Sequence, residues 1–417
     1  LDGRVVNTGV ERYKGLRKSH LEPVSSKHIN NHVMSLKVRT NGSGLDIAMA
    51  SSIHFYLNGE SVTPSSAVPE KEAKYVGSRF SITLCPGDEL VVEKLVSIYT
   101  SRDPGIYECL YEAEHAVMHP MSDFNDLMKA HTTAWEMLWR EFDFRLAMDD
   151  QNIQRYTQKI VRLYIFHLLQ SSSFHSIDID VGMPARGWHG EGYRGHIFWD
   201  EVIIFPFLNY RAPRITKTLL MYRYRRLNAA RRAAEAVGCK GAMYPWQSGS
   251  SGREETQKMH LNPDSGRWIK DHTHLQRHVN NAIVYNIWQY FQITHDIQFL
   301  SFYGGEIIIE IARFWASLAV YNPKEGRYEI FGLMGPDEFH DACPDAESVG
   351  LNNNSYTNMM VMFVMNQALN LQHVLPRYDW ECLQRKLKIE KSELATWQHM
   401  SRRMKLVFHQ DGILSQF

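Results

Sequence analysis

The period of the apolar residues changes once along the chain, and this change limits the fold more than any other feature. Up to about residue 110, short stretches alternate apolar and polar residues and are separated by turns rich in Gly, Asn and Pro: 33–38, 45–50, 80–84 and 90–98. A period of two residues is typical of strands with one buried face. The first part of the chain is therefore predicted to be an antiparallel β-sandwich.

After residue 110 the apolar residues recur every three to four positions, which predicts helices. Residues 111–147 are expected to form a helical connector. Further helices are expected at 150–171, 197–210, 214–237, 274–295, 298–320, 353–376 and 389–407. Long loops are expected at 182–196, 241–272 and 322–352. Because long loops on a rigid scaffold often carry binding residues, the pattern predicts an α/α toroid with functional loops gathered at one end.

The charge balance argues against two classes of partner. The 417 residues include 46 Lys and Arg and 46 Asp and Glu, which gives a formal net charge of zero. Nucleic acids and anionic membranes favour basic patches, so neither is expected as a partner. No apolar run approaches the length that crosses a bilayer. The 5 scattered cysteines lack CxxC spacing and predict reduced thiols in a cytoplasmic protein.

The first candidate site is the Gly-rich stretch 187–200. Its glycines allow the backbone to approach a ligand closely, while Arg194 and Asp200 can hydrogen bond to hydroxyl groups. Trp199 places a stacking ring beside the carboxylate of Asp200. The simpler alternative is a turn that leads into a helix, with Asp200 on the surface. The density of polar and aromatic groups in one short loop favours a ligand-binding loop.

The second candidate site lies at 244–249. Trp246 could form a platform for a sugar ring, and Gln247 could hydrogen bond to two hydroxyl groups. The nearby carboxylates Glu254 and Glu255 are expected to begin an exposed stretch rather than to act in catalysis.

The third candidate, 272–278, is rich in histidine. His274 and His278 are four residues apart, which places both rings on one face of a helix. A zinc site needs a third ligand, and Gln276 and Arg277 occupy the centre of what would be an HExxH motif. The sequence therefore predicts no metal, and the histidines are expected to line a substrate or to cap a helix.

The fourth candidate is a Pro-Asp-Glu turn followed by an Asn-rich run. Acid catalysis needs a carboxyl group in a setting dry enough to keep its proton near neutral pH. Glu338 is the predicted general acid, whereas Asp337 is expected to be structural because neighbours in sequence seldom point the same way. His340, Asn353 and Tyr356 supply an imidazole, an amide and a ring that can bind a sugar. The alternative, a solvated turn carboxylate, is less compatible with these aromatic and Asn-rich surroundings.

Four segments in this order carry a family resemblance: GEGYRGHIFWD, GAMYPWQS, GPDEFH and NNNSYTN. They resemble glycoside hydrolase family 65, which includes maltose, trehalose and kojibiose phosphorylases and a minority of hydrolases. The resemblance covers most of the chain. The ordered motifs make it specific for the family but not for a substrate.

The resemblance implies a multidomain fold with a β-sandwich, a helical linker and an (α/α)6-barrel catalytic domain. We expect these parts at 1–112, 113–149 and 150–417. By the same resemblance the sandwich lacks its first part and the barrel lacks its final helices. A toroid without its closing helices would expose apolar faces, so residues 1–417 alone are expected to be poorly stable and inactive.

The resemblance also implies roles for individual residues. Glu338 matches the general acid of the family. Trp199 and Asp200 match the pair that lines the subsite for the non-reducing glucose, and Trp246 matches the ring that borders the acceptor subsite. Many members carry an acidic residue directly after that Trp, where this chain has Gln247.

The implied mechanism is inversion, in which Glu338 protonates the glycosidic oxygen while a nucleophile attacks the anomeric carbon from the opposite face. The leading hypothesis is phosphorolysis of an α-linked glucose disaccharide of the maltose, trehalose or kojibiose type. Inorganic phosphate is then the cosubstrate, and no cofactor is needed. The alternatives are an inverting α-glucoside hydrolase and a non-catalytic carbohydrate-binding protein. The expected partners are a disaccharide and phosphate, and a homodimer is left open.

Overall fold

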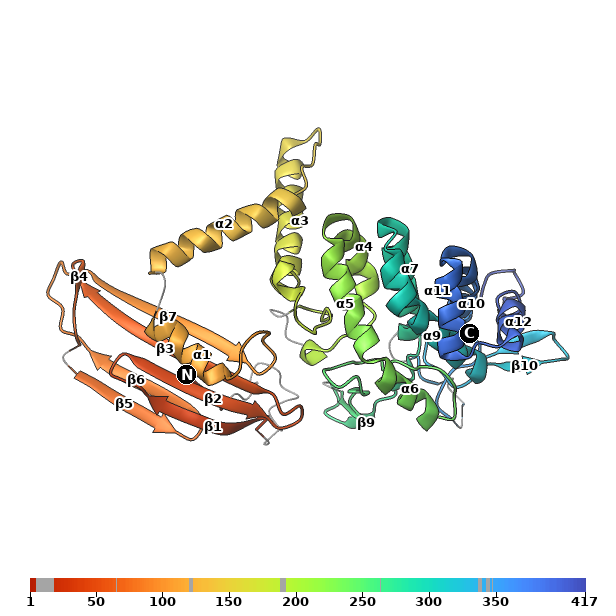
Figure 1. The fold of residues 1–417 in the computed structure, drawn as a ribbon, viewed down its shortest axis with the longest axis horizontal. Coiled ribbons are helices and arrows are strands. Elements are labelled where there is room, and N and C mark those ends of the chain that lie inside the picture. Colours follow the sequence, from red (N-terminus) through yellow and green to blue (C-terminus); the bar gives the residue numbers. More distant parts are fainter. Residues whose placement is uncertain are drawn as a thin grey trace. The chain divides into compact units, whose positions relative to one another are not determined.

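The chain forms an N-terminal antiparallel sheet domain and a helical domain, seen in a computed structural model (Figure 1). They correspond to two compact units, Leu1–Asp143 and Phe144–Phe417. The structure describes residues 1–4, 19–64, 66–119, 123–187, 193–262, 264–336, 340–342, 346 and 348–417. No helix in these ranges combines the length and the apolar content needed to cross a membrane.

The first unit is built on a five-stranded antiparallel sheet in which β3 is the central strand. β3 pairs with β2 on one side and with β7 on the other. The strands of this sheet are β1 (Leu21–His28), β2 (Val33–Thr40), β3 (Asp46–Leu57), β4 (Glu60–Ser61) and β7 (Leu90–Thr100). A separate antiparallel hairpin is formed by β5 (Ser66–Glu72) and β6 (Tyr75–Ser81).

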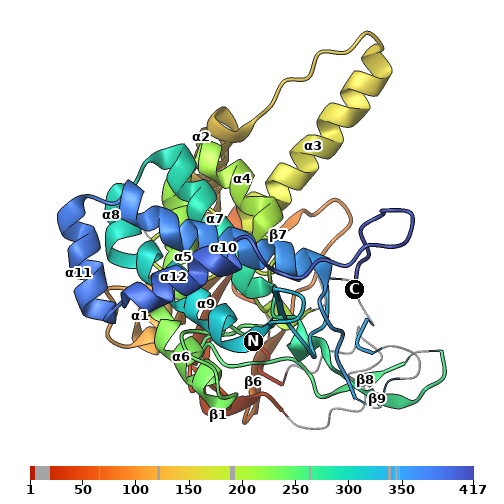
Figure 2. The same ribbon diagram turned by 90° about the vertical axis from the view of Figure 1, so that its right-hand side faces the viewer.

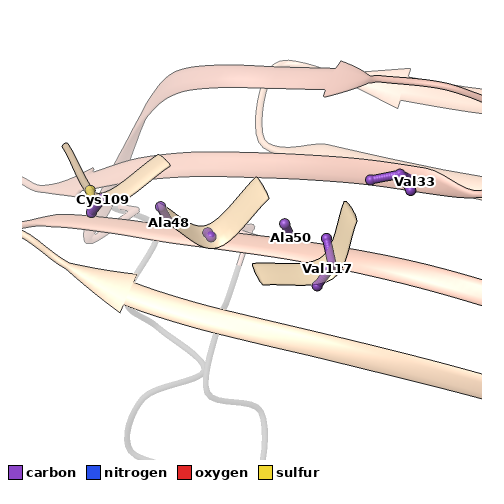
Figure 3. Close-up of a cluster of buried hydrophobic side chains, with 6 residues drawn as sticks. Val33, Ala48, Ala50, Cys109 and Val117 are labelled. Carbon is purple, nitrogen blue, oxygen red and sulfur yellow. The ribbon is translucent and has the colours of Figure 1, made fainter. Parts of the chain in front are cut away.

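The period of two places apolar side chains on both faces of this sheet. On one face the small side chains of Ala48 and Ala50 allow helix α1 (Cys109–Met118) to pack closely. Figure 3 shows this cluster, which consists of Val33, Ala48, Ala50, Cys109, Ala113 and Val117. On the opposite face, Met34, Leu36 and Val38 pack with Val76 of the β5–β6 hairpin. The sheet is thus covered by a helix on one face and by a hairpin on the other.

The predicted helical connector 111–147 is two helices, α1 and α2 (Phe124–Phe142). Each helix begins at an acidic N-cap: Glu108 accepts the backbone N–H of Tyr111 (2.7 Å), and Asp123 accepts that of Asp126 (2.9 Å). Such caps satisfy backbone donors that have no partner within the helix. The sequence period indicated helix but missed these caps, which set where each helix begins.

The second unit consists mainly of helices, and α7 and α9 carry much of its buried surface. α7 packs against α4, α5 and α10, while α10 also packs against α9 and α12. Figure 2 shows α9, α10 and α12 side by side. The helices are α3 (Gln151–Ser171), α4 (Glu201–Arg211), α5 (Pro213–Arg225), α6 (Leu227–Ala236), α7 (Val279–Thr294), α8 (Ile297–Phe299), α9 (Gly305–Leu318), α10 (Ser355–Val374), α11 (Arg377–Leu387) and α12 (Lys391–Met400), with a π-helical turn, η5 (Leu300–Gly304), before α9.

Several sequence predictions need correction. The helix predicted at 214–237 is interrupted at Arg226, whose backbone (φ −103°, ψ 7°) leaves the helical region and separates α5 from α6. The helix α11 was not predicted. The loops predicted at 241–272 and 322–352 contain short hairpins, which pair β8 (Met259–Leu261) with β9 (Trp268–Lys270) and β10 (Val320–Asn322) with β11 (Arg327–Glu329).

A glycine fixes the start of the second candidate loop on the scaffold. Gly241 has φ +73°, and a Cβ atom there would lie 2.0 Å from the carbonyl oxygen of Glu310 in α9. The next residue, Ala242, donates its backbone N–H to that same oxygen (2.9 Å). The absence of a side chain at Gly241 therefore allows the loop to dock directly on α9.

We predict that Gly241→Ala lowers the free energy of unfolding by about 2–4 kcal/mol, because it combines a positive φ with a backbone clash. Gly238→Ala is the matched control, since Gly238 has φ +76° but nothing within 4 Å of the added methyl group. The control should lose only about 1 kcal/mol. Urea unfolding of both variants measures the difference. Equal losses would contradict the docking contact.

Candidate active site

Four aromatic side chains from separate segments lie together in the helical domain. The ring of His278 lies 4.6 Å from that of Trp199 and 4.9 Å from that of Trp246, measured between centroids. Tyr356 is 6.0 Å from Trp199 and 6.1 Å from His278. We call these residues the aromatic cluster. It brings together three predicted sugar-binding residues, Trp199, Trp246 and Tyr356, that are distant in sequence.

His278 lies at the centre of the aromatic cluster and is fully buried. Neither ring nitrogen has a hydrogen-bond partner in the described part of the chain. Burial lowers the pKa of His278 to about 3, so the ring is neutral at neutral pH. Although His278 precedes α7, its side chain makes no capping hydrogen bond. Among the residues that the structure describes, no group of three or more His, Cys, Asp and Glu side chains could hold a metal ion.

Asp200 follows Trp199 at the start of α4 and is half-buried. Its side chain makes no capping hydrogen bond, and no other described residue pairs with the carboxylate. Burial raises the pKa of Asp200. A carboxylate beside a ring, with no protein partner, is suited to accept hydrogen bonds from sugar hydroxyls.

The segment that carries Trp199 and Asp200 is held by a buried ion pair. Nη2 of Arg223 in α5 lies 2.9 Å from Oε2 of Glu201, and both side chains are at most 2% exposed. The same Nη2 donates to the carbonyl oxygen of Phe198 (2.8 Å). These contacts fix the backbone on both sides of the Trp-Asp pair.

The second loop is positioned by a carboxylate that sequence reasoning assigned to an exposed stretch. Glu254 accepts the backbone N–H of Trp246 (2.9 Å) and that of Gln247 (3.1 Å). Its side chain also accepts from the hydroxyl of Thr256 (2.6 Å). Glu254 is exposed, as expected, but its positioning role could not be inferred because it depends on how the loop folds back.

Gln247 connects the first and second loops. Its Oε1 accepts from Nη2 of Arg194 (3.2 Å) and lies 3.1 Å from Nδ1 of His196. Gln247 is only 8% exposed. Tyr193 and Arg194 both have positive φ, 53° and 55°, a backbone conformation that costs free energy in residues with side chains and is found at functional sites. Arg194 and Gln247, predicted from different loops, are thus directly joined.

The segment leading to the predicted general acid is anchored beside the aromatic cluster. Leu275 accepts the backbone N–H of Met334 (3.2 Å), and Nε2 of Gln276 donates to the carbonyl oxygen of Gly335 (3.1 Å). Gln276 is two residues from His278 in sequence. Glu338, the predicted catalytic residue, and its neighbour Asp337 lie outside the described residues, as does the stretch 188–192 of the Gly-rich loop.

The remaining predicted residues lie at the start of α10 and nearby. Oδ1 of Asn353 accepts the backbone N–H of Ile330 (3.1 Å), and Asn353 has φ +56°. His340 places its ring 5.9 Å from that of Phe417. Asn354, which was not predicted individually, caps α10 by accepting the backbone N–H of Thr357 (3.0 Å). In these contacts Asn353 supports the backbone, while its sugar-binding role stays a prediction.

Comparison with known protein families agrees with this architecture. The family description "Glycosyl hydrolase family 65 central catalytic domain" matches residues 162–417, and "Glycosyl hydrolase family 65, N-terminal domain" matches residues 1–138. The chain belongs to glycosyl hydrolase family 65. The resemblance drawn from the four sequence motifs is therefore confirmed.

Several relatives match this family 65 chain along its whole length. An uncharacterized glycosyl hydrolase of Mycobacterium tuberculosis (strain ATCC 25618 / H37Rv) is 40% identical over 100% of this chain and 31% of its own length. Trehalose 6-phosphate phosphorylase of Lactococcus lactis subsp. lactis is 33% identical, and kojibiose phosphorylase of Halothermothrix orenii is 32% identical; this chain covers 50% and 52% of them. The chain thus spans about half the length, or less, of these relatives.

The fold of the family 65 chain is also similar to that of a solved structure from the human microbiome. The TM-score is 0.73 and the sequence identity is 21%, over 100% of this chain and 50% of the other. At this identity the likeness concerns the fold alone.

Asp200→Asn is predicted to stabilise the protein at pH 7 and to impair function. Burial raises the pKa of Asp200 in the folded state above its value in the unfolded chain. The neutral carboxyl group therefore contributes stability below the unfolded pKa, and this contribution is lost as pH rises through the folded pKa. The variant should be more stable than the unmodified protein at pH 7 and equally stable near pH 3. Unfolding at both pH values measures this. Lower stability of the variant at pH 7 would contradict the conclusion that the Asp200 carboxylate is half-buried and unpaired.

Proposed function

We propose that the protein is an inverting phosphorylase of an α-linked glucose disaccharide of the maltose, trehalose or kojibiose type. The products are β-glucose 1-phosphate and a free sugar. The main support is similarity to curated relatives named trehalose 6-phosphate phosphorylase, kojibiose phosphorylase and 1,2-alpha-glucosylglycerol phosphorylase. Because the chain spans only part of those relatives, the proposal concerns the full-length protein.

In this proposal Glu338 donates a proton to the glycosidic oxygen as the bond to the anomeric carbon breaks. Phosphate attacks that carbon from the opposite face and becomes the 1-phosphate group with inverted configuration. Trp199 and Asp200 bind the glucose that is transferred, the donor glucose. Trp246 and Gln247 border the sugar that leaves, which is the acceptor in the reverse reaction. The cosubstrate is inorganic phosphate.

One observation supports the placement of the acid. The hydrogen bonds of Met334 to Leu275 and of Gly335 to Gln276 hold the chain just before the Pro-Asp-Glu turn to the segment that precedes His278. His278 in turn contacts Trp199 and Trp246. The turn therefore begins close to the rings that would hold the sugar on both sides of the bond to be cleaved.

We also propose that the helical domain is part of an (α/α)6 barrel and that the N-terminal sheet domain is part of a β-sandwich. The divisions 1–112, 113–149 and 150–417 remain our proposal for the sandwich, linker and barrel. A cytoplasmic location is proposed from the scattered cysteines. Cys85, Cys109, Cys239 and Cys382 are free thiols in the described residues.

Glu338→Gln in the full-length protein is predicted to lower kcat by about 10²–10⁴-fold, the range expected for loss of a general acid, while the folded structure is retained. The assay supplies maltose, trehalose, nigerose and kojibiose with and without phosphate and measures glucose 1-phosphate and glucose. Phosphate-dependent release of β-glucose 1-phosphate supports the proposal. Glucose release that is indifferent to phosphate would indicate hydrolysis instead, and substantial activity of the variant would exclude Glu338 as the acid.

A further inference from the structure

We propose that the acceptor side of this site recognises an anionic sugar, such as a phosphorylated hexose, through Arg194 and Gln247. The inference rests on the proposed function, because it assigns a chemical class to the sugar that leaves in that reaction. It is carried by the hydrogen bonds among Arg194, His196 and Gln247, which lie directly beside Trp246.

The guanidinium of Arg194 is bound only to neutral groups. Its Nη2 donates to Oε1 of Gln247 (3.2 Å) and to the backbone carbonyl oxygen of Glu255 (3.1 Å). No described carboxylate forms an ion pair with Arg194, and its side chain is exposed. The positive charge is therefore accessible to a ligand and has no direct carboxylate partner within the described ranges.

The nearby carboxylates are engaged elsewhere. Glu254 accepts the backbone N–H groups of Trp246 and Gln247, and its Oε2 lies 3.9 Å from Nη1 of Arg277. Oε1 of Glu255 lies 3.5 Å from Nη2 of Arg253. Each carboxylate thus has donors of its own, and neither forms an ion pair with Arg194.

The contacts of Gln247 also determine which end of its side-chain amide, the carbonyl oxygen or the nitrogen, remains available to a ligand. Arginine can only donate hydrogen bonds, so the atom of Gln247 that faces Arg194 must be the carbonyl Oε1. His196 must then donate from Nδ1 to that same oxygen, and burial keeps the pKa of His196 low, in agreement with a neutral ring. The amide nitrogen of Gln247 has no hydrogen-bond partner among the described residues, which leaves it able to donate to a ligand.

Beside Trp246 the site thus presents an uncompensated guanidinium and an amide N–H₂ group. Both are donors, and a guanidinium binds phosphate or carboxylate oxygens with shorter and stronger hydrogen bonds than it forms with neutral oxygens. A neutral hexose could use the amide but would leave the charge of Arg194 unmatched. A carboxylate at position 247 would neutralise Arg194 and offer only acceptors. The glutamine therefore favours a sugar that brings the negative charge itself.

The test measures binding of glucose 6-phosphate and of glucose to the full-length protein by calorimetry, which does not depend on turnover. We expect glucose 6-phosphate to bind at least about tenfold more tightly, a difference of about 1.4 kcal/mol. Arg194→Gln and Gln247→Glu should each remove this preference, the first by deleting the charge and the second by neutralising it. Lys258→Gln is the matched control, because Lys258 is an exposed cation of the same loop, and it should retain the preference.

Equal or weaker binding of glucose 6-phosphate would overturn the inference. A second result would also overturn it: Arg194→Gln weakens the binding of inorganic phosphate and leaves the preference for glucose 6-phosphate over glucose unchanged. Arg194 would then bind the phosphate cosubstrate rather than the sugar. Failure of the proposed function is a separate outcome. In that case the full-length protein would release no sugar phosphate from any disaccharide, whereas the difference in binding between the two sugars would still decide the inference.

Discussion

The arrangement of the candidate site depends on a buried arginine. Arg223 donates to Glu201 and to the carbonyl oxygen of Phe198, while its own carbonyl oxygen accepts the hydroxyl of Tyr244 (3.0 Å). A guanidinium removed from water costs several kcal/mol unless it is paired and hydrogen bonded. If the segment around Trp199 moved away, both ions would lose their partners inside the domain. The ion pair therefore specifies one position for the Trp-Asp segment relative to α5.

Hydrogen bonds also hold the first and second candidate loops together. Ile197 and Ser248 exchange a pair of backbone hydrogen bonds (2.9 Å each). The hydroxyl of Tyr222 in α5 contacts Oγ of Ser248 (2.7 Å) and donates to the carbonyl oxygen of Gly249 (2.6 Å). The loops are thus joined to each other and to the scaffold through backbone groups. Under the proposed function, rings and polar side chains held in this way would need little reordering when a sugar binds, which favours affinity.

Much of this site could be predicted from local sequence, and the rest required the tertiary structure. Trp199 and Trp246 stand in recognisable motifs, so they could be named as site candidates without a fold. The central place of His278 was not, because it results from packing between segments rather than from the spacing of histidines. For the fold, the strands with a period of two were found, whereas α11 was missed. It buries only Trp380 and Leu383, too few apolar residues to produce a clear helical period.

The Gly-rich stretch 187–200 supplies two side chains of opposite charge, Arg194 and Asp200. On the side proposed for the transferred glucose, Asp200 is a carboxylate without a described partner. On the proposed acceptor side, Arg194 is a guanidinium bound only to neutral oxygens. The ring of His278 in the aromatic cluster is neutral, since burial lowers its pKa to about 3. Under the proposed function, opposite charges in the two sugar sites would favour one direction of binding for a disaccharide with an anionic sugar, because reversing it would place that sugar against Asp200.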